Sequence, residues 1–114
     1  MNYLLTEEQQ MIRDLARKVA LEKVLPKRAE WDETGEFPWE AIKALSAADL
    51  CGLYIPEEYG GMGQSVLSFC LVTEEISRIC GGVGVTCAAS ALGAVPILLF
   101  GTEEQKKKHL PEIA

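Results

Sequence analysis

Thiol and imidazole groups are the side chains of this sequence with the widest chemistry, and their spacing limits what they can do. The four cysteines contain no C-x-x-C pair: Cys51, Cys70, Cys80 and Cys87. A zinc site needs clustered ligands, and a catalytic thiol needs a histidine as its base. The single histidine, His109, stands in a lysine-rich stretch that predicts a helix end. We therefore expect no metal site, and we expect the cysteines to act as small buried hydrophobic groups in a reducing compartment.

The stretch LCGLYIPEEYGGMGQS, residues 50–65, holds four glycines and one proline between two segments with helical patterns. A glycine-rich loop can bind phosphate through its backbone N–H groups. This loop lacks the lysine of a P-loop, and no long strand pattern precedes it. Pro56 fixes φ, and Gly60, Gly61 and Gly63 permit backbone angles closed to other residues. We favour an architectural corner, with phosphate binding or contact with another domain as the alternatives.

The composition predicts a folded domain that does not bind nucleic acid. The chain has 114 residues, 48% hydrophobic and 25% charged, with a net charge of −6. This is enough apolar material for a core, whereas binding a nucleic-acid backbone requires a basic face. The N-terminus shows no basic start followed by an apolar run. We therefore expect no signal or transit peptide and a cytoplasmic protein.

Helix signals dominate the elements that must position these groups. Thr6, Ser65 and Thr102 are N-cap residues for three predicted helices, and Thr6 forms a capping box with Gln9. Apolar residues then recur at helical spacing, and no segment alternates polar and apolar residues as a half-buried strand does. The sequence predicts an all-α fold, an up-and-down bundle of six or seven helices with short connections.

Residues 79–102 contain no charged side chain. An uncharged stretch of this length is long enough to span a bilayer. Several glycines, Pro96, and serine and threonine residues interrupt the stretch. We interpret it as a helix buried inside a protein, Val83–Ala94, followed by a short helical turn, Ile97–Phe100. A membrane-spanning helix is the alternative. A second predicted helix, residues 66–78, is also apolar on most sides, which indicates that the chain packs against more protein.

Four pieces of the sequence occur in an order that resembles a known family. They are the capped helix LTEEQQMIRDLARKVA, the corner P-E-x-Y-G-G-x-G, the helix end EE-I-x-R, and the ending PIL-x-FG-x-EEQK-x-x-x-LP. Together they resemble the N-terminal helical domain of the flavin-dependent acyl-CoA dehydrogenases, over essentially the whole chain, residues 1–114.

The resemblance implies a parent enzyme that oxidises acyl-CoA to trans-2-enoyl-CoA and passes electrons to an electron-transferring flavoprotein. In this family a β-domain and a C-terminal helical domain hold most of the FAD and supply the catalytic glutamate. Family members run on beyond the position of Ala114. The resemblance therefore implies an excised domain of a homo-oligomeric enzyme, with no catalytic residue in this chain and no activity alone.

The resemblance also places one wall of the acyl pocket on the helix Val83–Ala94, beside the flavin. The matching positions are Gly84, Val85, Ala88, Ala89 and Leu92. The minimal side chains at Gly84 and Ala88 predict a deep or wide cavity for a longer, branched or ring-bearing acyl group. The alternative is that these small residues serve ordinary helix packing.

Two further classes of function fit the same residues. A non-catalytic helical binding or assembly module would be monomeric with a polar surface, whereas an excised domain would expose the apolar face that met its neighbours. A member of the same family that hydrates its substrate, oxidises it with oxygen or reduces it, rather than dehydrogenating it, would show the same sequence motifs in this domain.

Overall fold

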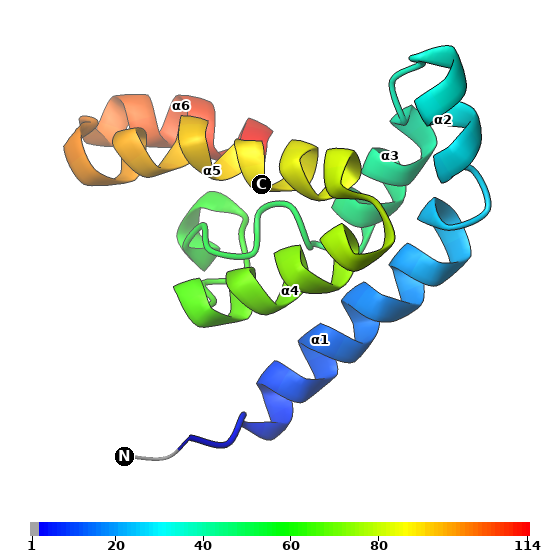
Figure 1. Cartoon of the computed structure of the whole chain (residues 1–114). Coiled ribbons are helices and arrows are strands. Elements are labelled where there is room, and N and C mark those ends of the chain that lie inside the picture. The colour runs from blue at the N-terminus through cyan, green and yellow to red at the C-terminus, as the bar shows by residue number, and fades with distance from the viewer. Residues whose placement is uncertain (1–2) are drawn as a thin grey trace.

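The computed structural model describes residues 3–114, and this part of the chain forms six α-helices and no strand (Figure 1). The helices are α1 (Glu7–Val19), α2 (Arg28–Thr34), α3 (Trp39–Ala47), α4 (Val66–Ile79), α5 (Gly81–Phe100) and α6 (Glu103–Ile113). A π-helical turn, Ala20–Val24, continues α1, and a short 3₁₀ turn, Glu57–Tyr59, lies between α3 and α4. The predicted all-α fold is confirmed.

Side-chain caps begin three of the helices at the predicted residues. The Thr6 hydroxyl accepts from the Gln9 N–H at 3.2 Å, and the Gln9 side chain accepts from the Thr6 N–H at 3.0 Å. Thr102 and Gln105 form a second capping box at α6. The Ser65 hydroxyl accepts from the backbone N–H three residues later at 3.2 Å and begins α4. These caps fix where three of the helices start.

Two predicted helix ends are wrong. The segment of small residues and the turn after it form one helix, α5, of 20 residues with Pro96 in its interior. Proline removes one backbone donor, but the neighbouring helical hydrogen bonds hold the segment together. For the helix that begins after Pro38, the sequence predicts Gly52 as the stop. The structure ends α3 at Ala47 instead, because Asp49 takes a positive φ of 58° that no α-helix accommodates.

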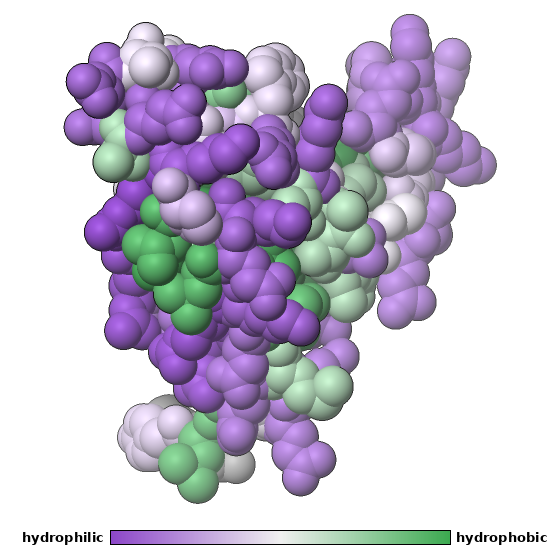
Figure 2. Space-filling model, turned by 90° about the vertical axis from the view of Figure 1, so that its right-hand side faces the viewer, coloured by the Kyte–Doolittle hydropathy of each residue, from purple (hydrophilic) through white to green (hydrophobic). Residues whose placement is uncertain are grey.

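The main core lies among α1, α3, α4 and the first half of α5. Its fully buried members include Ala16, Val24, Leu45, Leu50, Leu53, Val72, Ile76 and Val83. Helix α4 packs against α1 on one side and against α5 on the other. Figure 2 shows the side of the molecule that faces right in Figure 1, where hydrophilic groups cover most of the surface and apolar groups lie in patches between them.

A second, smaller core joins the glycine corner to the far half of α5 and to α6. It consists of Ile55, Tyr59, Ala94 and Leu110. The Tyr59 hydroxyl donates to the Glu103 carboxylate at 2.8 Å, which ties the corner to the start of α6. That hydrogen bond raises the pKa of Tyr59 to about 12. The corner thus sets how α6 lies along α5.

The corner itself has the geometry of an architectural element. Gly60 and Gly63 take positive φ angles of 91° and 62°, which favour glycine. The N–H groups of Gly60, Gly61 and Gly63 donate to the carbonyls of Glu57, Pro56 and Ile55 at 3.0, 3.3 and 2.8 Å. These donors are engaged within the corner and do not point at an open anion site. The structure supports the predicted architectural role over phosphate binding.

Glu75 is the one charged side chain that is buried among residues 3–114. Arg17 on α1 donates to both of its carboxylate oxygens, at 2.9 and 3.0 Å, and Arg78 donates at 3.2 Å. The hydrogen bonds from Arg17 hold the pKa of Glu75 below its ordinary value. Since pairing offsets the cost of burying the carboxylate, this ion cluster fixes α1 against α4. The EE-I-x-R motif is therefore structural in this chain.

Candidate functional site

Four of the five predicted site residues lie on or beside one exposed face of α5. Val85, Ala89 and Leu92 recur every three or four residues and so share a side of the helix. Val85 is 69% exposed and Leu92 is 79% exposed. Ala89 is also exposed, and Ala88, at the edge of this face, is half-buried. No charged residue occurs anywhere on α5.

The fifth predicted residue, Gly84, lies against a neighbouring helix. It is buried, and a Cβ at this position would overlap the hydroxyl of Ser77 on α4 and lie 3.1 Å from the Ser77 Cα. The missing side chain lets α5 approach α4 closely. Gly93, in contrast, has nothing within 4 Å of a built Cβ. A role for Gly84 in the acyl pocket stays a prediction.

The exposed face extends to the C-terminal end of α5. Its large apolar side chains are Val85, Leu92, Val95, Leu99 and Phe100, and we call this set, with Ala89, the α5 face. Phe100 is 86% exposed and Leu99 is 68% exposed. An uncharged exposed surface of this kind is typical of a contact surface and not of a solvated helix.

α5 is also the helix within residues 3–114 that is long and apolar enough to cross a membrane, and 22% of its most apolar window is buried. The sequence predicts a helix buried inside a protein, in a chain that packs against more protein. Within this chain α5 is covered by α3, α4 and α6 and is open on the α5 face, so burial of that face stays a prediction.

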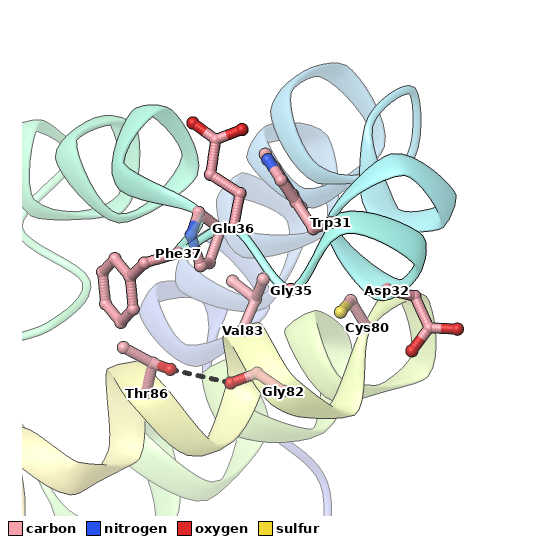
Figure 3. A pocket seen from close by; sticks show the side chains of 10 residues that line it. Trp31, Asp32, Gly35, Glu36, Phe37, Cys80, Gly82, Val83 and Thr86 are labelled. Carbon is pink, nitrogen blue, oxygen red and sulfur yellow. Dashed lines mark hydrogen bonds between the residues drawn. The ribbon is translucent and has the colours of Figure 1, made fainter.

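A cavity of about 360 Å³ lies beside the first half of α5 (Figure 3). Its walls come from α2, from the connection between α2 and α3, and from the start of α5: Trp31, Asp32, Gly35, Glu36, Phe37, Pro38, Cys80, Gly82, Val83 and Thr86. The carboxylates of Asp32 and Glu36 point away from its centre. The interior could therefore hold an apolar group.

The cavity was not predicted from the sequence, and none of the five predicted site residues lines it. It depends on Gly35, whose φ of 71° ends α2 and turns the chain back toward α5. The Thr86 hydroxyl donates to the Gly82 carbonyl at 2.8 Å, so it is satisfied within the helix. A glycine after a short amphipathic helix signalled the turn, but nothing in the sequence indicated which helix the turn would meet.

The chemistry that these residues offer is binding. Within residues 3–114, no group of three His, Cys, Asp or Glu side chains is placed to hold a metal ion. Glu75 is committed to two arginines and Glu103 to Tyr59. The expectation that all four cysteines are buried is wrong, because Cys70 is exposed and Cys80 is half-buried.

The chain is similar to acyl-CoA dehydrogenases over its whole length. The family model "Acyl-CoA dehydrogenase, N-terminal domain" matches residues 6–114. The probable acyl-CoA dehydrogenase YngJ of Bacillus subtilis is 44% identical over 100% of this chain and 30% of that protein.

Three solved structures show the same fold. A chain from the electron transferring flavoprotein study of Acidaminococcus fermentans is 44% identical with a TM-score of 0.92, over 100% of this chain and 30% of that chain. Butyryl-CoA dehydrogenase from Megasphaera elsdenii is 38% identical with a TM-score of 0.92, over 99% of this chain and 30% of that one. Acyl-CoA dehydrogenase complexed with FAD from Bacillus anthracis is 36% identical with a TM-score of 0.81, over 96% of this chain and 19% of that one.

The chain thus spans about 30% of the length of YngJ and of the Acidaminococcus fermentans chain. What it shares with the solved structures is the fold of this helical domain. The family match covers all but the first five residues. The chain belongs to the acyl-CoA dehydrogenase family, as an N-terminal domain of that family.

Proposed function

We propose that this domain supplies one wall of the acyl pocket, and shields the flavin, in an enzyme that oxidises acyl-CoA to trans-2-enoyl-CoA. The observation that carries the proposal is the α5 face, which is exposed, apolar and free of charge over the length of a 20-residue helix. The similarity to acyl-CoA and butyryl-CoA dehydrogenases supports this substrate class.

The α5 face suits an acyl chain because contact with it removes CH₂ groups of the chain from water. Burial of each CH₂ group is favourable by about 0.8 kcal/mol. The α5 face would also exclude water from the bond that reacts. Exclusion of water prevents side reactions at the flavin and the substrate. We assign these two roles to Val85, Ala89 and Leu92, whose side chains point away from the domain's own core.

The chain's residues fit the apolar edge of a flavin but not the rest of an FAD molecule. The α5 face has no cation that could pair with the FAD pyrophosphate. We therefore propose that other domains hold the cofactor and that this domain covers it. When bound, FAD supplies the hydride acceptor of the reaction. The similarity to a relative complexed with FAD supports this assignment.

We propose that the catalytic base comes from outside this chain, and the absence of a glutamate on the α5 face supports this assignment. We propose that electrons leave the enzyme through an electron-transferring flavoprotein. The match to a chain from the Acidaminococcus fermentans flavoprotein study supports this partner class. Oligomer contacts would likewise lie in the domains that this chain does not include.

The depth of the pocket depends on Ala88 and Ala89 more than on Gly84. Ser77 fills the space that the missing side chain of Gly84 leaves. Methyl groups at positions 88 and 89 leave room on the open side of the helix. We propose an acyl group that is longer than butyryl, branched or ring-bearing.

Anaerobic mixing of the full-length flavoprotein with saturated acyl-CoA thioesters tests the proposal. We expect the visible absorbance of the oxidised flavin to bleach and a trans-2-enoyl-CoA to form. The matching enoyl-CoA is the control, because it has no hydride to give at that bond. A flavin that dithionite reduces, but that no acyl-CoA of any length reduces, would rule the proposed activity out.

A further inference from the structure

Two cysteines that are 36 positions apart in sequence meet inside the main core. The Sγ atom of Cys51 lies 3.2 Å from the Sγ atom of Cys87. Cys51 belongs to the segment that follows α3, and Cys87 lies in the middle of α5. Both are buried, with 7% and 1% of their surface exposed. The two sulfur atoms are close enough for one thiol to donate a hydrogen bond to the other.

Hydrogen bonds from α5 side chains hold the backbone next to the two cysteines. The Ser90 hydroxyl lies 2.8 Å from the Cys51 carbonyl and 2.8 Å from the Cys87 carbonyl, so its single O–H bridges the two carbonyls. The Cys87 thiol also lies 3.8 Å from the Leu50 carbonyl. These contacts fix the segment after α3 against α5, so the sulfur atoms stay neighbours without a covalent bond.

The two thiols differ in reactivity. The hydrogen bond from Cys87 holds the pKa of Cys51 below its ordinary value, although burial opposes this shift. The same interaction raises the pKa of Cys87. The thiolate is the nucleophilic form of cysteine, and Cys51 is also the more exposed of the two. Cys51 is therefore the attacking residue and Cys87 is the resolving one.

We propose that Cys51 and Cys87 form a reversible disulfide when the protein meets hydrogen peroxide. The Cys51 thiolate attacks one peroxide oxygen, the O–O bond breaks, and hydroxide leaves, which oxidises Cys51 to a sulfenic acid. The Cys87 sulfur then attacks the Cys51 sulfur, the S–O bond breaks, and a second hydroxide leaves. The two thiol protons convert the hydroxides to water. Two thiols and one peroxide thus give one disulfide and two waters.

The disulfide would act as a clamp on α5. An S–S bond of about 2.05 Å would draw the sulfur atoms together by roughly 1 Å. The closed loop contains the glycine corner and α4, so the bond would restrict the unfolded chain. This clamp lies in the domain's own core, behind the α5 face. The inference therefore does not depend on the proposed function.

The test is a disulfide map of the native full-length protein after treatment with hydrogen peroxide and blocking of free thiols. Trypsin with a glutamate-specific protease separates Cys51 from Cys70, because Glu57 and Glu58 lie between them. Fragmentation of the linked peptide separates Cys80 from Cys87. We expect the Cys51–Cys87 link as the main disulfide of this domain, reversed by dithiothreitol. We also expect the thermal unfolding midpoint of this domain to rise by roughly 10 °C.

Two controls make the result specific. Oxidation in urea should give mixed pairings of the four cysteines, since the folded core no longer selects a pair. The variant Cys87→Ser should lose the link and leave a sulfenic acid on Cys51 that dimedone traps, whereas Cys70→Ser should keep the link. The wild-type map decides the matter even if Cys87→Ser fails to fold. Recovery of Cys51 and Cys87 as blocked thiols, at a peroxide dose that oxidises exposed Met11, would overturn the proposal.

Discussion

The variant Leu92→Glu should abolish acyl-CoA oxidation by the full-length enzyme while leaving the fold of this domain intact. Leu92 is 79% exposed in this chain, so a glutamate there meets water and should change the free energy of unfolding by less than about 0.5 kcal/mol. In the assembled enzyme the same carboxylate would lose its water without gaining a partner. That costs several kcal/mol, and about 1.4 kcal/mol corresponds to a factor of ten in rate. We expect turnover to fall by at least about 100-fold.

Leu92→Met is the matched control, because it keeps the volume and apolarity of the side chain. It should retain most of the turnover at every acyl length. Urea unfolding of this domain measures the stability of both variants, and steady-state oxidation of acyl-CoA measures their activity. Wild-type turnover for Leu92→Glu would mean that the α5 face stays in water in the full-length enzyme.

The variant Gly61→Ala should destabilise the domain by about 3 kcal/mol. A Cβ on Gly61 would overlap the backbone carbonyl of Ile55, and a backbone atom cannot rotate away as a side chain can. Ile55 is fully buried in the second core with Ala94 and Leu110. The corner would have to move away from α5 and α6 to admit the methyl group.

Gly93→Ala is the control for Gly61→Ala. Gly93 lies inside α5 with open space around it, so alanine should stabilise the helix by about 0.5–1 kcal/mol. Urea titration should therefore move the unfolding midpoints of the two variants in opposite directions. Equal midpoints would show that the corner yields at little cost and does not set the position of α6.

The local features of this fold could be predicted from the sequence because each depends on residues that are close in the chain. The Thr6–Gln9 capping box, the Ser65 cap and the left-handed turn at Gly35 are of this kind. The end of α3 at Ala47, just before the left-handed Asp49, was missed because glycine at position 52 is the stronger stop signal and a left-handed aspartate is uncommon.

The site could be predicted only in part. Helical spacing puts Val85, Ala89 and Leu92 on one face, but spacing does not say whether the same chain or another covers that face. Gly84 has the same small size as Gly93, yet Ser77 packs against the first and open space surrounds the second. The pairing of Cys51 with Cys87 arises from tertiary packing across 36 positions, and no motif marks it.

The measurement that tests the central claim most directly is photoaffinity labelling of the full-length enzyme with an acyl-CoA that carries a diazirine near the end of its acyl chain. If α5 forms a wall of the acyl pocket, the label will attach within the peptide that contains Val85, Ala88, Ala89 and Leu92, and excess unlabelled acyl-CoA will prevent it. Protected labelling that falls entirely in the other domains, with α5 unmodified, would contradict the claim.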